Sequence, residues 1–201
     1  KIFYFKHLTT FILFLIGAVY FYKLLLFRFE NKLIACLGFV FLILSPRIFA
    51  SSFYSPNDIV FMSLIIISTY YSLKFIHTDK FKYLTITSIF LSLCIATRPV
   101  AIYIPALVSL FYIYNLIQKK KSFKDVLKNL IIYTIFQIFF LFVLNPVLWT
   151  DLINNLYLSI KTGVSYPATY PKILYLGKFI EITNLPWHYL LVWISITTPV
   201  L

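Results

Sequence analysis

Long apolar runs joined by short basic loops constrain this chain more than any other feature. The sequence has 201 residues, of which 61% are hydrophobic and 12% charged, so too few polar side chains exist to cover a water-soluble domain. Hydrocarbon cannot bond backbone N–H and C=O groups, and the runs are continuous rather than alternating, which favours helices over barrel strands. We therefore predict an all-α, polytopic transmembrane helical bundle of about six to seven spans.

The predicted spans belong to a single transmembrane domain, because no internal repeat or low-complexity linker divides the chain. They cover roughly residues 8–27, 33–49, 59–77, 83–97, 100–117, 126–145 and 188–201, and a long polar loop takes up residues 146–187. The chain starts at Lys1, and its last apolar run stops at Leu201. We expect it to be a fragment of a longer protein.

Basic residues gather on one side of the predicted membrane. The loops on that side contain Lys23, Arg28, Lys32, Lys74, Lys80, Lys82, Lys119, Lys120, Lys121, Lys124 and Lys128. Short loops rich in Lys and Arg stay in the cytoplasm. Residues 45–58, 97–99 and 146–187 are therefore predicted to share the outer face.

Several function classes are disfavoured by charge and motifs. The net charge of +12 comes mainly from loop lysines that set topology, so we predict no nucleic-acid partner. Cys36 and Cys94 fall near opposite ends of their spans, which disfavours a disulfide. The sequence shows no Gly-rich phosphate loop, no G-x-S-x-G elbow and no H-E-x-x-H motif. We therefore predict no nucleotide chemistry of the kind found in soluble enzymes.

Asp58 is the acid that most needs an explanation, since the chain has only six. It stands in "SPRIFASSFYSPNDIVF", residues 45–61, between two apolar runs. "SPND" before an apolar run is typical of a helix N-cap, where a short acceptor side chain and the helix dipole favour an acid. Capping and chemistry are both compatible with this position.

Two arginines are predicted on the same face as Asp58. Arg47 follows Pro46 at the end of one run, and Arg98 precedes Pro99 at the end of another. Guanidinium groups facing an outer cavity would suit the phosphate of a lipid-linked substrate. The alternatives are snorkelling to the interface or a structural ion pair with Asp58.

Prolines and aromatic residues alternate in the predicted outer loop. The motifs are "NPVLW" (145–149), "SYPATYP" (165–171) and "NLPWHY" (184–189), and the candidate substrate-binding residues within them are Tyr166, Tyr170, Trp187 and His188. Such aromatic rings can stack on a sugar or grip a polyprenyl tail, although aromatic residues are also common anchors at the membrane interface. His188 has no acidic or His partner at ligand spacing, which disfavours a metal.

The order "SPRIFASSFYSPNDIVFMSL", "ATRP", "NPVLW" and "LPWHYLLVWISITTP" resembles a bacterial member of the dolichyl-phosphate-mannose protein mannosyltransferase-like family, in the C-type glycosyltransferase superfamily (GT-C). The resemblance implies a multi-pass enzyme of the bacterial cell membrane whose extracytoplasmic site takes a sugar from a polyprenyl phosphate. The acceptor would be a hydroxyl of a protein, a lipid or a cell-surface glycan, and protein glycosylation is one such activity.

The resemblance also assigns roles to residues. Asp58 matches a second acidic position that assists metal or substrate positioning, and Arg98 matches a basic residue near the donor phosphate. The first acid, the expected base, would lie in an N-terminal outer loop missing from this sequence, so we expect the fragment alone to be inactive. No cofactor is predicted with certainty, and a divalent metal would be compatible. The rival hypothesis is a transporter or lipid flippase, which would place charges or broken helices near the bilayer midplane.

Overall fold

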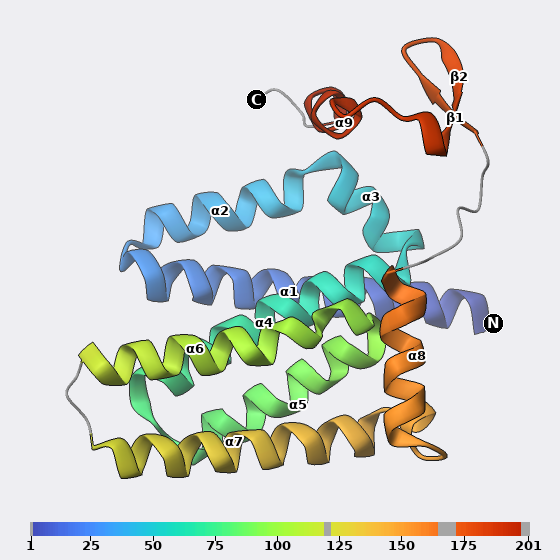
Figure 1. Cartoon of the computed structure of the whole chain (residues 1–201). Coiled ribbons are helices and arrows are strands. Elements are labelled where there is room, and N and C mark those ends of the chain that lie inside the picture. Colours follow the sequence, from blue (N-terminus) through green and yellow to red (C-terminus); the bar gives the residue numbers. More distant parts are fainter. Residues whose placement is uncertain (1, 119–121, 165–171, 198–201) are drawn as a thin grey trace. The chain divides into compact units, whose positions relative to one another are not determined.

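Helices make up most of the computed structural model, which describes residues 2–118, 122–164 and 172–197 (Figure 1). The elements are α1 (Ile2–Phe29), α2 (Lys32–Leu44), α3 (Pro46–Tyr54), α4 (Pro56–Thr78), α5 (Phe81–Thr97), η1 (Pro99–Ile102), α6 (Tyr103–Gln118), α7 (Phe123–Leu144), η2 (Pro146–Leu148), α8 (Leu152–Val164), β1 (Lys172–Tyr175), β2 (Lys178–Glu181), η3 (Ile182–Asn184) and α9 (Tyr189–Thr197). The predicted all-α bundle is confirmed. The chain forms two compact units, Lys1–Gly163 and Val164–Leu201.

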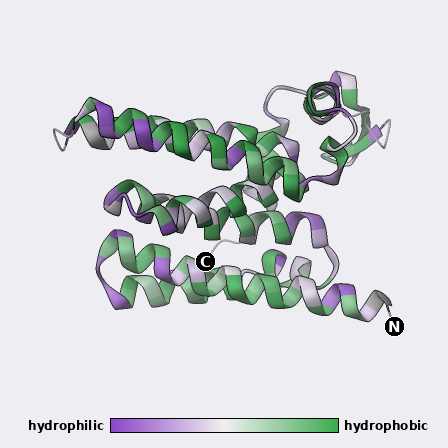
Figure 2. Ribbon diagram, turned by 90° about the horizontal axis from the view of Figure 1, so that it is seen from below, coloured by the Kyte–Doolittle hydropathy of each residue, from purple (hydrophilic) through white to green (hydrophobic). Residues whose placement is uncertain are grey.

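Three described helices are long and apolar enough to cross a bilayer: Tyr4–Phe29, Pro56–Thr78 and Phe123–Leu144. The pair formed by α2 and α3 makes a fourth candidate, while Phe81–Thr97 and Pro99–Tyr114 are apolar but shorter. Hydrophobic residues run along the helices, and hydrophilic ones concentrate towards helix ends (Figure 2). The outward apolar surface matches a protein that lipid surrounds.

The predicted span 33–49 is divided between two helices, because the helix breaks before Pro46. α2 ends at Leu44, and α3 begins at Pro46 with its axis turned by 59°. Proline has no N–H to donate, and it disfavours a helical conformation in the residue before it. Ser45 accordingly has an extended backbone, with φ −60° and ψ 110°.

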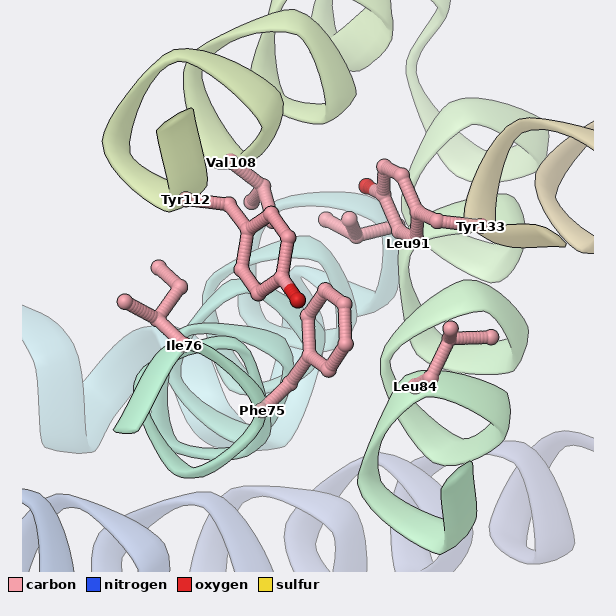
Figure 3. Packing of buried hydrophobic residues seen from close by; sticks show 7 residues of the cluster. All are labelled: Phe75, Ile76, Leu84, Leu91, Val108, Tyr112 and Tyr133. Atoms are coloured by element: carbon pink, nitrogen blue, oxygen red, sulfur yellow. The ribbon is translucent and has the colours of Figure 1, made fainter. Parts of the chain in front are cut away.

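The first unit is built around α4, which packs against α1 on one side and α5 on the other (Figure 1). Three aromatic rings meet in one of its buried clusters. The ring of Phe75 on α4 stacks on Tyr112 of α6 at 4.8 Å and on Tyr133 of α7 at 5.8 Å between centroids. Figure 3 shows these rings converging with Leu84 and Leu91 of α5. Asn129 donates a 2.7 Å hydrogen bond to the Tyr112 hydroxyl.

Small hydroxyl residues are buried on α4 and α5, where these helices meet their neighbours. The buried members are Ser63, Ser68 and Ser72 on α4 and Thr87, Ser88 and Ser92 on α5. Gln137 of α7 donates to the Ser92 hydroxyl at 3.0 Å, which links two helices. Small residues let helix backbones approach closely in lipid, where hydrophobicity alone does not drive association.

At Gly17, α1 lies very close to Ser63 of α4. A Cβ added there would lie 2.7 Å from Oγ, 2.8 Å from Cβ and 3.0 Å from Cα of Ser63. We expect Gly17→Ala to lower the free energy of unfolding by about 1–3 kcal/mol, because backbone would have to move. Chemical unfolding of the purified protein in detergent measures this loss.

Gly38 provides the matched control for that substitution. The atom nearest an added Cβ at Gly38 is the end of the flexible Leu25 side chain, which can rotate away. Gly38→Ala is therefore expected to cost less than Gly17→Ala. An equal cost at the two positions would contradict the tight α1–α4 contact.

The second unit contains an antiparallel hairpin of β1 and β2. Tyr175 pairs with Lys178 across a two-residue turn, in which Leu176 has φ 48° and Gly177 has φ 79°. Two successive positive φ values are those of a type I′ turn, the tight hairpin turn that matches strand twist. The region predicted as a long loop, 146–187, therefore contains η2, α8 and this hairpin. The predicted last span is described as helix only over Tyr189–Thr197.

Candidate functional site

Asp58 lies in the first turn of α4, the helix that directly follows α3. Ser55 is the N-cap and Pro56 the first helical residue, so the predicted N-cap at Asp58 is wrong by three positions. Asp58 is instead the third helical residue, where the helix dipole still favours a carboxylate. The Ser55 hydroxyl donates to Oδ2 of Asp58 at 2.9 Å. This contact fixes one of the two carboxylate oxygens.

Arg98 occupies the matching end of α5. Its N–H still donates to the carbonyl of Cys94 at 2.9 Å, but its own backbone is extended, with φ −143° and ψ 111°. Pro99 imposes this conformation, since a residue before proline avoids the helical region. The helix stops there, and the Arg98 side chain leaves it at the end of the bundle.

Arg98 and Asp58 form an ion pair between α5 and α4. An Nη atom of Arg98 donates to Oδ1 of Asp58. The guanidinium also lies 5.9 Å from the ring centroid of Phe61, one turn further along α4. The structure thus joins two of the predicted site residues, as the shared face of the two span ends suggested.

The pair is accessible from outside the protein. The side chain of Arg98 is 45% exposed and that of Asp58 is 62% exposed. An exposed ion pair contributes about 0–1 kcal/mol to stability, because water screens it. The small gain in stability from joining α4 to α5 therefore does not by itself explain why these two charged residues are present.

A second buried apolar cluster includes residues of both helices that carry the ion pair. It is formed by Leu64 of α4, Cys94 and Ile95 of α5, Ala101 of η1, Leu141 of α7 and Leu148 of η2. The cluster joins the end of α7 to the segments that carry Asp58 and Arg98. The "NPVLW" motif therefore belongs to the same end of the bundle, where Trp149 donates from Nε1 to the carbonyl of Phe142 at 2.8 Å.

Arg47 is exposed in the first turn of α3, whereas Asp58 lies in the first turn of α4. Among the described residues, Arg98 is the cation that forms a salt bridge with Asp58. The role of Arg47 in substrate binding stays a prediction.

The aromatic candidates belong to the second unit. Trp187 is 86% exposed, and its ring meets that of His188 edge to face at 5.5 Å. His188 in turn lies 6.1 Å from the Tyr175 ring, which packs on Tyr189 at 5.3 Å. Tyr166 and Tyr170 lie outside the described residues. Substrate binding by all four candidates stays a prediction.

The donor atoms near Asp58 do not fit a divalent cation. One carboxylate oxygen faces a guanidinium and the other accepts from a hydroxyl, so both already have partners. Over residues 2–118, 122–164 and 172–197, no group of three or more His, Cys, Asp or Glu side chains comes together. The two thiols, of exposed Cys36 and buried Cys94, are free.

A hollow of about 340 Å³ lies between α4 and α6, away from the ion pair. Its lining is mainly apolar and includes Leu73, Ile76, Leu107 and Val108, together with His77. No acid lines it. Neither Asp58 nor Arg98 lines this hollow.

Two residues of the site escaped sequence reasoning. Ser55 could have been found from the S-x-x-D spacing to Asp58, which resembles a capping box. No sequence pattern marks Phe61, because its contact with Arg98 exists only when the end of α5 packs against α4.

The helical bundle and its exposed acid–cation pair define an integral membrane protein with a polar site at one end of the helices. The chain belongs to the dolichyl-phosphate-mannose-protein mannosyltransferase family, whose model matches residues 7–149. This membership places it among membrane glycosyltransferases of the mannosyltransferase-like kind. The match includes both Asp58 and Arg98 and ends at Trp149, before α8 and the second unit. No curated protein and no solved structure matches the chain.

Proposed function

We propose that this protein transfers a sugar from a polyprenyl-phosphate donor to an acceptor hydroxyl, with Asp58 and Arg98 at the reaction site. The observation that supports the proposal is the exposed ion pair between these residues, inside the region that matches the family. The pair contributes little to stability. An acid and a cation at the end of a membrane bundle are the groups that transfer from a lipid-linked phosphate requires.

The donor needs electrostatic help rather than covalent chemistry. The acceptor oxygen bonds to the anomeric carbon of the sugar, the bond from that carbon to the phosphate oxygen breaks, and polyprenyl phosphate leaves with the electron pair. A general base takes the hydroxyl proton. The protein must align the two substrates and stabilise charge on the departing phosphate.

Arg98 would bind that phosphate, and in doing so it would exchange partners. Phosphate offers a guanidinium a stronger, bidentate acceptor than an exposed carboxylate. When the donor arrives, Arg98 turns from Asp58 to the phosphate. The freed Oδ1 of Asp58 then accepts a hydrogen bond from the acceptor hydroxyl and orients it, while Ser55 holds Oδ2. The resting ion pair thus keeps both groups in place between turnovers.

The remaining predicted residues would contact the same substrates. Arg47 would add positive charge on the shared face, and Tyr166, Tyr170, Trp187 and His188 would stack on the sugar or the polyprenyl tail. The site would face the extracytoplasmic side of a bacterial inner membrane, as the loop lysines indicate. Proteins, lipids and cell-surface glycans all carry suitable acceptor hydroxyls.

The proposal is tested with the whole protein in sealed vesicles of known orientation. Two donors, polyprenyl-phosphate mannose and nucleotide-linked mannose, are tested in separate reactions. Each donor is supplied to one face of the vesicle membrane at a time. We expect transfer from the polyprenyl-linked donor alone, and only when it reaches the face that carries Asp58. Movement of the lipid-linked sugar across the bilayer without any glycosylated product would instead support the flippase hypothesis.

A further inference from the structure

Helix α8 crosses the end of the first unit instead of running along it. Figure 1 shows it lying across the ends of α5 and α7, and Figure 2 shows one helix end-on beside the others. Hydrogen bonds fix its start, since Asp151 Oδ1 accepts from the N–H of Asn154 at 3.1 Å. Asn155 donates from Nδ2 to the Val147 carbonyl at 2.7 Å. In a bilayer that α7 crosses along its axis, α8 would lie along the membrane surface.

The apolar stripe of α8 is wider than the part that the protein covers. Leu156 and Ile160 line a narrow crevice. Leu156 also packs against the buried apolar cluster that includes Leu64 and Cys94. The adjoining edge of the same stripe is left open, with Ile153 80% exposed and Tyr157 59% exposed. An amphipathic helix of this kind buries its free apolar edge at the boundary between head groups and acyl chains.

A cation and an indole border that open edge. Nζ of Lys161 lies 5.8 Å from the ring centroid of Tyr157, one turn before it, so the ammonium caps the apolar edge. Lysine places its charge among phosphates while its stem stays with apolar neighbours. Trp149, just before α8, is 59% exposed, and its ring is of the type that anchors proteins at this depth.

We propose that α8 binds the phospholipid surface, with Ile153 and Tyr157 between head groups and acyl chains and Lys161 at the phosphates. A bilayer is the occupant that combines an apolar layer with anionic charge at the level where α5 and α7 end. The crevice that receives Leu156 and Ile160 is also lined by Ile95 and Pro99, which flank Arg98. Binding of α8 to the lipid surface would thereby hold Arg98, at the junction of α5 and η1, at a fixed height relative to the membrane.

Spin labels on α8 test this inference without any assay of activity. The whole protein, with Cys36 and Cys94 replaced, carries a label at Ile153→Cys or, as a second position, Tyr157→Cys. Thr162→Cys is the matched control, because nine residues place it on the opposite side of the helix. Each variant is placed in bilayers of zwitterionic and anionic phospholipid, and collisions with oxygen and a water-soluble nickel chelate are measured.

We expect oxygen to dominate at positions 153 and 157 and the nickel chelate to dominate at 162. Two outcomes overturn the inference. High nickel accessibility at all three positions would place the edge in water. Low accessibility of 153 and 157 to both reagents would mean that another protein segment, and not lipid, covers the edge.

Discussion

Replacing Asp58 by asparagine is expected to reduce sugar transfer from a polyprenyl-phosphate donor by about 100-fold or more, the scale of an acid–base or positioning group in the transition state. The amide keeps the size of the side chain and an oxygen that can accept from Ser55. It loses the charge that pairs with Arg98 and orients the acceptor. Initial rates with the whole protein in vesicles measure the loss.

Asp151→Asn is the matched control for this change. It makes the same substitution at an acid whose described role is to accept the N–H of Asn154, which asparagine does equally well. We expect its transfer rate to stay at the wild-type level. Unfolding of Asp58→Asn should differ from wild type by no more than about 1 kcal/mol, because the ion pair is exposed. Wild-type turnover by Asp58→Asn would remove Asp58 from the site.

Arg98→Gln should weaken use of the lipid-linked donor. A hydrogen bond from a charged group to phosphate is worth about 1.5–3 kcal/mol, which corresponds to a fall in kcat/KM of roughly 10- to 150-fold. The kcat/KM of Arg98→Lys should fall between those of the wild type and Arg98→Gln, because an ammonium retains the charge but lacks the planar guanidinium fork. Rates measured over a range of donor concentrations separate KM from kcat.

Lys82→Gln controls for the loss of a positive charge in general. Lys82 is an exposed residue near the start of α5, at the opposite end of that helix from Arg98. We expect its kinetics to match those of the wild type. An Arg98→Gln protein with an unchanged kcat/KM for the donor would contradict phosphate binding at Arg98.

Sequence patterns were sufficient for the helical class and for the shared face of Asp58 and Arg98. Continuous apolar runs leave helices as the main solution in lipid, and counting spans puts the start of one run beside the end of another. An ion pair with Asp58 was one of the alternatives, but which arginine forms it could not be predicted. The partner depends on how the end of α5 packs against the start of α4, and that follows from the contacts between these two helices.

Two features of the fold were missed for local reasons. The break at Pro46 falls inside an apolar run, and hydropathy alone does not register a lost N–H. Helix α8 was assigned to a polar loop because Asn154, Asn155 and Ser159 interrupt the apolar residues along the sequence. Its apolar stripe is recognised only at helical spacing. The helix period, rather than mean hydropathy, carries that information.

A double-mutant cycle on the transfer rate tests most directly whether Asp58 and Arg98 act together in catalysis. Rates are measured for wild type, Asp58→Asn, Arg98→Gln and the double variant under one set of donor and acceptor concentrations. Residues that work as a unit give strongly non-additive losses. We predict that the double variant loses about as much as the more damaging single change. Losses that multiply, or single variants with wild-type rates, would contradict a shared reaction site.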